Sequence, residues 1–125
     1  MSPLATQAPF AFPKEVRLRR RGQFLLVQER GQKFTADCLL CLVLPHPQPG
    51  TSTRLGLTVS TKVGPAVVRN RIRRVLRDLF RRRKARLPSG LDVVLIARSS
   101  AAQADTARLT RAYERLEREL EKKYR

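Results

Sequence analysis

The sequence is poor in the residues that carry out most protein catalysis. Among 125 residues there are one histidine, two cysteines, no tryptophan and only 10 acidic side chains. General acid-base catalysis and metal binding draw mainly on these types. The acids are scattered without paired spacing, and no phosphate-binding glycine loop or nucleophile elbow is present. We therefore expect no catalytic residue and no metal site in the protein itself.

Long apolar runs are also missing. No stretch approaches the ~20 residues that a membrane-spanning helix requires. The first 12 residues lack the charged leader and apolar stretch of a secretory signal. The single C-x-x-C pair, Cys38 and Cys41, has no second pair to complete a zinc site, so both are predicted to be core residues. These absences predict a small cytoplasmic protein.

Positive charge is abundant. Lysine and arginine number 27, the formal net charge is +17, and 42% of the residues are hydrophobic, enough for a core. Arginine accounts for 21 of the basic residues, and its planar fork of donors matches phosphate better than lysine does. The composition favours a nucleic-acid partner. A basic coat that only aids solubility is the alternative, although such a coat would mix both signs.

The charge is unevenly placed. Residues 14–86 hold 19 basic and 4 acidic side chains, whereas residues 105–125 hold 7 and 5. The first segment is predicted to form the binding surface and the last a mixed, solvated one. Residues 1–13 contain three prolines and are predicted to be a mobile arm. Residues 14–125 then form a single RNA-binding domain.

Hydrophobic periodicity gives a coarse element order. A short helix near Phe24 ends at Gly31, where glycine can adopt the left-handed conformation cheaply. Strands are expected at residues 34–44, 54–62 and 91–97, with two or three strands before the central helix. This order predicts an α/β sandwich with helices against a small sheet.

Two longer helices complete the expected order. The central one covers residues 65–86, with Pro65 at its first position. The last begins at Asp105, with Ser100 as a rival start, and has an inner stripe of Leu109, Ala112, Tyr113, Leu116 and Leu120. If strands 54–62 and 91–97 are parallel neighbours, the general rule favours a right-handed crossover between them.

The central helix sorts its side chains by face. A helical wheel gathers Val68, Ile72, Val75, Leu76, Leu79 and Phe80 on one side. Because this stripe must be buried, the opposite stripe must face solvent. Arg69 and Arg71 flank the boundary. The outward stripe consists of Asn70, Arg73, Arg74, Arg77, Arg81 and Lys84.

Two residues allow two interpretations each. Asn70 interrupts an arginine row, which favours hydrogen bonding to a sugar or base, but it is also compatible with a plain surface amide. Phe24 in a short helix is more often a core residue, yet aromatics beside basic residues can stack on unpaired bases.

The segment RLGLTVSTKVGPAVVRNRIRRVLRDLFR, residues 54–81, resembles the central signature of the bacterial ribonuclease P protein family. Residues 18–31 resemble the first helix of that family and residues 91–98 its last strand. The resemblance covers residues 17–120. It implies a ribosomal-protein-like fold of order αβββαβα with a left-handed βαβ crossover at the central helix, opposite to the general rule.

The resemblance also implies a function. Family members assist a catalytic RNA that uses Mg²⁺ to remove the 5′ leader of precursor tRNA. Carried over by position, the surface for the catalytic RNA consists of Arg69, Asn70, Arg71, Arg73, Arg74, Arg77 and Arg81. The cleft for the leader would consist of Phe24, Lys62, Arg98, Thr58, Ser60 and Arg17.

This sequence departs from the family pattern at two positions. Gln28 and Leu42 stand where relatives often carry aromatics, so weaker base stacking and a larger role for the basic rim are expected. No obligate protein partner is predicted. A structural ribosomal protein or a general RNA-binding module is the alternative function, since a basic α/β domain of this length fits that class too.

Overall fold

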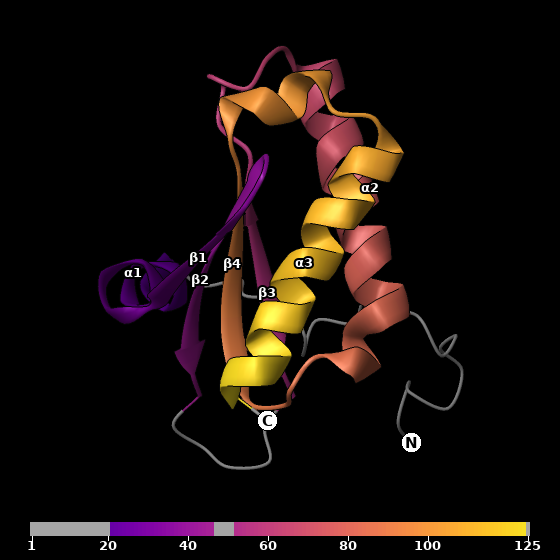
Figure 1. Ribbon diagram of the computed structural model, residues 1–125. Helices are drawn as coiled ribbons and strands as arrows, with labels where there is room; N and C mark the ends of the chain where they lie inside the picture. Colours follow the sequence, from indigo (N-terminus) through magenta and orange to yellow (C-terminus); the bar gives the residue numbers. More distant parts are fainter. Residues whose placement is uncertain (1–20, 47–51, 125) are drawn as a thin grey trace, which may run out of the picture.

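The computed structural model describes residues 21–46 and 52–124. The predicted arm at residues 1–13 and Arg17 lie outside this part of the chain. The elements follow the order αβββαβα (Figure 1). They are α1 (Arg21–Arg30), β1 (Gln32–Ala36), β2 (Leu39–Pro45), β3 (Arg54–Thr58), α2 (Ala66–Arg83), the 3₁₀ helix η3 (Lys84–Arg86), β4 (Leu91–Ala97), the 3₁₀ helix η4 (Ser99–Gln103) and α3 (Thr106–Tyr124).

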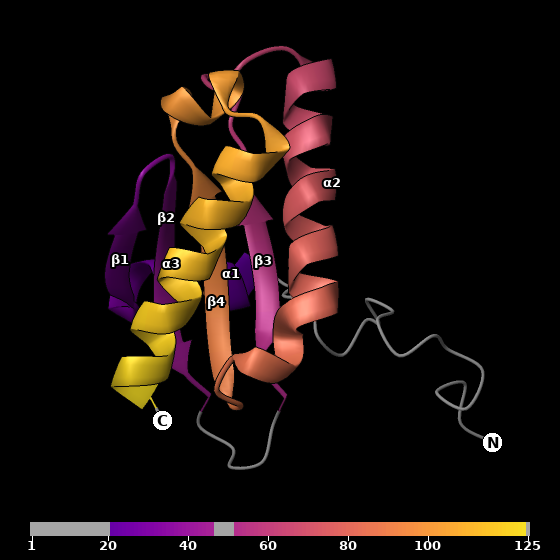
Figure 2. The same ribbon diagram turned by 45° about the vertical axis from the view of Figure 1, so that its right-hand side comes forward.

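The four strands form one mixed sheet in the order β1-β2-β4-β3. Strand β4 is internal, antiparallel to β2 and parallel to β3. Its continuous apolar sequence fits this position, because both of its faces are covered. Viewed from the helices with β3 and β4 running upward, β4 lies to the left of β3 (Figure 2). The crossover through α2 is therefore left-handed, and the right-handed expectation from the general rule is wrong here.

The expected single strand at residues 34–44 is in fact a hairpin. Strand β1 ends at Ala36 and β2 begins at Leu39, with Ala36 paired to Leu39 across a tight turn. Asp37 has a φ of 52°, in the left-handed region that aspartate tolerates better than most residues. The apolar run hid this turn, because neither glycine nor proline marks it.

Helices cover both faces of the sheet (Figure 1). Helices α2 and α3 enclose the main core, and α1 packs on the opposite face, against β2 and β4. There Val27 and Val94 are fully buried, with Phe24 and Leu42 packed around them. Leu42 therefore contributes to the core on this face of the sheet.

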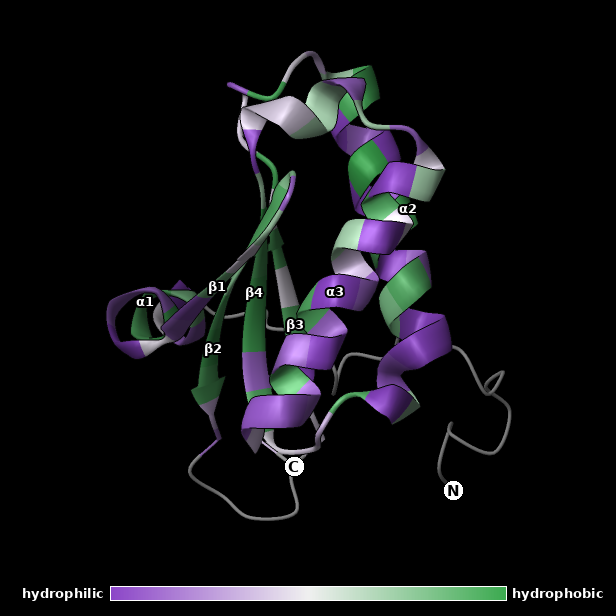
Figure 3. Ribbon diagram, in the orientation of Figure 1, coloured by the Kyte–Doolittle hydropathy of each residue, from purple (hydrophilic) through white to green (hydrophobic). Residues whose placement is uncertain are grey.

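The helical wheel of α2 is confirmed. Ile72, Leu76 and Phe80 are fully buried, and the other apolar members of the stripe pack against the same core. The helix begins at Ala66 with Pro65 as its N-cap, one residue later than predicted. Such a difference of one residue is common at helix ends. Figure 3 shows α2 and α3 as alternating hydrophilic and hydrophobic bands against a largely hydrophobic sheet.

The start of α3 follows the prediction. The backbone N–H of Arg108 donates to Oδ1 of Asp105 at 2.8 Å, which caps the helix. The rival start at Ser100 lies in η4, a separate 3₁₀ turn. All five members of the predicted inner stripe are buried.

Gly31 ends α1 as predicted, but for a different reason. Its φ lies outside the left-handed range, and its N–H donates to Val27 O at 2.7 Å. A Cβ at this position would lie 2.3 Å from the same carbonyl oxygen. Close approach of the backbone, not a left-handed conformation, therefore requires glycine here.

Cys38 and Cys41 are both buried and unpaired, which confirms them as core residues. Burial raises the pKa of both thiols, and that of Cys41 to about 12. A thiol with so high a pKa is a poor nucleophile at neutral pH.

Candidate nucleic-acid interface

The outward face of α2 forms a shallow, strongly basic hollow. Four arginines, one asparagine and one aspartate line it. Because the apolar stripe anchors α2 to the core, this face is held toward solvent over most of the helix. The lining residues are Asn70, Arg73, Arg74, Arg77, Asp78 and Arg81.

Two arginines of this face are exposed and have no partner among the described residues. Within the described residues, Arg74 and Arg77 make no hydrogen bond or ion pair. They lie three residues apart and hence about 4.5 Å apart along the helix axis. Two such guanidiniums present several unused N–H donors to a ligand with closely spaced anionic oxygens.

Arg81, by contrast, is paired with Asp78 on the same helix. Arg82 lies 3.1 Å from the other carboxylate oxygen. The hydrogen bond from Arg81, followed by the charge of Arg82, holds the pKa of Asp78 below its usual value. Arg81 would therefore have to exchange this partner for phosphate, which makes it a weaker candidate than its neighbours.

The other three arginines of the predicted surface donate hydrogen bonds to backbone carbonyls outside α2. Nε of Arg69 donates to Gly64 O at 3.0 Å, Nη2 of Arg71 to Ala104 O at 3.0 Å, and Nη2 of Arg73 to Val59 O at 3.2 Å. These carbonyls belong to the loop before α2, the link before α3 and the end of β3. Sequence patterns do not predict these bonds, because the acceptors are backbone carbonyls in loops that only the fold brings close to α2. Each guanidinium keeps further donors for a ligand.

Asn70 also takes part in the hydrogen bonds made by these arginines. Its Oδ1 accepts a hydrogen bond from Nη1 of Arg73 at 3.2 Å. This contact orients Arg73 and leaves the Asn70 amide donors pointing toward exposed surroundings. Asn70 is thus more than an isolated surface amide, although its predicted contact with a sugar or base stays a prediction.

Three of the residues predicted for the leader cleft line a second shallow hollow. Ser60 and Lys62 follow β3, and Arg98 follows β4, so the parallel pairing brings them to the same edge of the sheet. All three side chains are exposed. Nη1 of Arg98 donates to Asp37 O at 3.3 Å, which links this edge to the β1–β2 turn. Two cations and a hydroxyl at one edge can bind an anionic oxygen.

Phe24 and Thr58 lie further along the opposite face from the main core. Phe24 is half-buried and packs against the Val27–Val94 cluster together with Ile96. Thr58 is the register partner of Ile96 on the neighbouring strand, so the two share a sheet face. Phe24 and Thr58 therefore lie on the same face of the sheet. Gln28 is exposed on α1 and adds no aromatic surface there.

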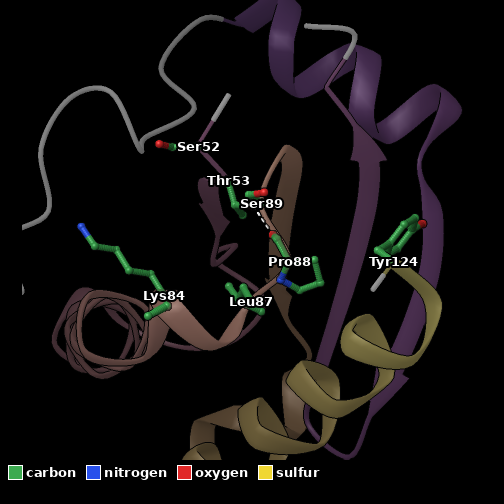
Figure 4. A pocket seen from close by; sticks show the side chains of 8 residues that line it. Ser52, Thr53, Lys84, Leu87, Pro88, Ser89 and Tyr124 are labelled. Atoms are coloured by element: carbon green, nitrogen blue, oxygen red, sulfur yellow. Dashed lines mark hydrogen bonds between the residues drawn. The ribbon is translucent and has the colours of Figure 1, made fainter. Parts of the chain in front are cut away.

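The hollow in Figure 4 lies at the other end of the sheet and contains none of the predicted site residues. Thr53 donates to Pro88 O and accepts from the Leu91 N–H at 3.2 Å. These bonds tie the start of β3 to the turn before β4. We assign this region a structural role.

Two absences concern metal binding and membrane insertion. Within residues 21–46 and 52–124, no three His, Cys, Asp or Glu residues gather closely enough to hold a metal ion. No helix in the same part of the chain is long and apolar enough to cross a membrane.

A mixed sheet between helices, with an arginine-lined helix face held toward solvent, defines a class of RNA-binding α/β domain. Comparison with known proteins narrows this class. The family model "Ribonuclease P" matches residues 12–121. The chain is 41% identical over 95 residues to the ribonuclease P protein component of Desulfovibrio desulfuricans, covering 76% of this chain and 73% of that protein. It is 38% identical over 107 residues to that of Desulfatibacillum aliphaticivorans, covering 86% and 89%.

Solved structures agree with the sequence comparisons. The ribonuclease P protein of Thermotoga maritima superposes with a TM-score of 0.74 at 30% identity, covering 82% of this chain and 96% of that one. The Staphylococcus aureus protein gives 0.73 at 25% identity, covering 90% and 100%. The chain belongs to the bacterial ribonuclease P protein family. It is a protein subunit of ribonuclease P in tRNA processing, with the ribonuclease P RNA as its partner, and the ribosomal alternative is not favoured.

Proposed function

We propose that the outward face of α2 binds the catalytic RNA of ribonuclease P. The observation that carries this proposal is the pair of exposed, unpartnered guanidiniums of Arg74 and Arg77 on a face that the core holds toward solvent. Arg69, Arg71 and Arg73 would add their remaining donors while they keep their loops in place. Arg81 and Asn70 complete the surface, with Arg81 first released from Asp78.

The 5′ leader of precursor tRNA is the proposed ligand of the second region. Lys62 and Arg98 would attract leader phosphates at the edge of the sheet, with Ser60 beside them. Thr58 would line the floor of this leader-binding region, and Phe24 would stack its ring on a base. Arg17, which is predicted to extend this basic rim, lies outside the described residues.

The chemistry is proposed to belong to the RNA. Mg²⁺ ions held by the RNA would support hydrolysis of the phosphodiester bond that releases the leader, and this chain would supply no catalytic residue. Its own side chains would bind the RNA, bind the leader and neutralise phosphate charge, so that less Mg²⁺ is needed. The same proposal places the protein in the cytoplasm, where bacterial precursor tRNA is processed.

Reconstitution tests the proposal. The purified chain is combined with a bacterial ribonuclease P RNA, and release of the 5′ leader is followed at low Mg²⁺ with and without protein. We expect faster release with the protein, and a smaller gain for a variant with Arg74→Ala and Arg77→Ala. An equal rate with and without the wild-type chain would reject the proposal.

A further inference from the structure

Residues 105–125 hold 7 basic and 5 acidic side chains, and helix α3 places several of these acids and arginines on different sides. Two of its acids face α2, where Glu117 and Glu114 both pair with Arg83. Nε and Nη2 of Arg83 donate to Glu117 at 3.1 and 2.9 Å, and Glu117 is only 4% exposed. The carboxylate of Glu117 is therefore directed away from the outer side of α3, and Arg83 is shared between Glu117 and Glu114.

Three arginines lie on the outer side of the same helix. Arg111, Arg115 and Arg118 are exposed and make no hydrogen bond or ion pair within the described residues. Their spacing of four and three residues places them on one stripe, with steps of about 6 and 4.5 Å along the axis. We call these three residues the α3 stripe. Together they line one shallow hollow with Asp37, Ala112 and Glu114.

The two acids of this hollow do not cancel the stripe. Both carboxylate oxygens of Asp37 accept hydrogen bonds from Arg108, at 2.8 and 2.9 Å. This pairing, with the nearby charges of Arg111 and Arg98, lowers the pKa of Asp37. Glu114 lies 3.2 Å from Arg83. Arg108 balances Asp37, whereas Arg83 is shared between Glu114 and Glu117, so Glu114 offsets at most one of the three positive charges and the hollow stays positive.

Such a stripe has a cost for the isolated protein. Like charges one turn apart destabilise a helix by a few tenths of a kcal/mol per pair. Glu117 is buried on the side of α2 and cannot relieve this repulsion. A polyanion on the outer side would relieve it instead.

We propose that the α3 stripe is a second RNA-binding surface, which contacts the phosphate backbone of another segment of the ribonuclease P RNA. This proposal rests on the proposed function but uses none of the residues that line the hollow on α2. All three cations are arginines, whose planar forks match phosphate oxygens. The separation of neighbouring guanidiniums by one turn suits successive phosphates of a strand better than a single anion.

The test compares two double variants of equal net charge. Arg115→Ala with Arg118→Ala removes most of the α3 stripe, and Lys33→Ala with Lys123→Ala removes two exposed lysines outside both surfaces. Binding of each to ribonuclease P RNA alone, without tRNA, is titrated over a range of KCl concentrations. Each lost phosphate contact should lower the slope of log K against log salt by roughly 0.7 to 0.9, or about five- to eightfold in affinity near 0.1 M salt.

The expected result is a clear loss of slope for the arginine variant and little change for the lysine variant. The loss should add to that of Arg74→Ala with Arg77→Ala, since the two surfaces share no residue. Equal behaviour of the two double variants would overturn the inference, because the stripe would then act only through net charge. An acidic protein partner or a solubility role would give that same negative result, while wild-type binding and leader release would still support the proposed function.

Discussion

At the scale of single residues, the arginines of α2 differ by what already occupies them. Arg74 and Arg77 are uncommitted, Arg73 holds Val59 and Asn70, and Arg81 is paired with Asp78. A helical wheel treats all four alike. The structure distinguishes these arginines by their partners. Those partners are backbone carbonyls or a neighbouring acid, which hydrophobic periodicity does not predict.

Arg77→Ala should therefore weaken binding to ribonuclease P RNA with a loss of roughly 0.7 to 0.9 in the log–log salt slope. The matched control is Arg82→Ala, which removes the same charge from the same helix at a position outside the basic hollow. Titrations at several salt concentrations measure both. A slope for Arg77→Ala equal to that of the control would show that Arg77 does not contact phosphate.

Phe24 can be tested separately from the core that it supports. Phe24→Leu keeps an apolar side chain against Val27 and Val94 but removes the aromatic face. We expect a small loss of stability, below about 1.5 kcal/mol, and a selective loss of precursor tRNA affinity of about 1–3 kcal/mol if the ring stacks on a base. Thermal unfolding and tRNA binding are the two measurements. Equal loss for precursor and mature tRNA would assign Phe24 to the core alone.

At the scale of elements, the sequence predicted what periodicity and capping control. The buried stripe of α2, the Asp105 cap and the central apolar strand β4 all follow from local patterns. The Asp37 turn was missed because neither glycine nor proline marks it within the mostly apolar segment 34–44. The left-handed crossover came only from the family resemblance, since general packing rules favour the opposite hand.

The contact between α2 and α3 depends on Arg83. Glu117→Ala should destabilise the protein by about 1.5–3 kcal/mol, because it removes two charge-assisted hydrogen bonds and leaves a largely buried guanidinium with Glu114 only. Glu119→Ala, on an exposed position of the same helix, is the control and should stay within about 0.5 kcal/mol. Urea unfolding measures both. Similar free energies of unfolding for the two variants would contradict this role of Glu117.

The burial of Cys41 between the helices and the sheet predicts that the protein loses stability at alkaline pH. The pKa of Cys41 is raised from 9.0 to about 12 by burial. Above pH 9 the unfolded chain releases this proton before the folded one does, so stability is complete below pH 9 and declines toward pH 12. One such group contributes at most about 1.4 kcal/mol per pH unit. Unfolding measured across this range should show a shallower decline for Cys41→Ala, and an unchanged decline would refute the assignment.

At the scale of the whole molecule, the full sequence has a formal net charge of +17, and the described residues place much of their basic charge as surfaces around an apolar core. The sheet and its two layers of helices bury the apolar residues, and the acids with buried or paired carboxylates brace the frame from within, as Asp92 does with Arg54 at 2.8 Å. Among the described residues, unpaired arginines gather on the outward face of α2 and on the α3 stripe, and Lys62 and Arg98 lie at the edge shared by β3 and β4. A protein built in this way can contact a large folded RNA and a short single strand at the same time.

In the proposed function, the α2 surface binds the catalytic RNA and the edge shared by β3 and β4 binds the 5′ leader. The most direct test is equilibrium binding of the reconstituted ribonucleoprotein to precursor tRNA and to mature tRNA under identical salt and Mg²⁺. We predict tighter binding of the precursor, and a reduced preference when Lys62→Ala and Arg98→Ala are combined. Equal affinity of the wild-type complex for the two tRNAs would contradict the account.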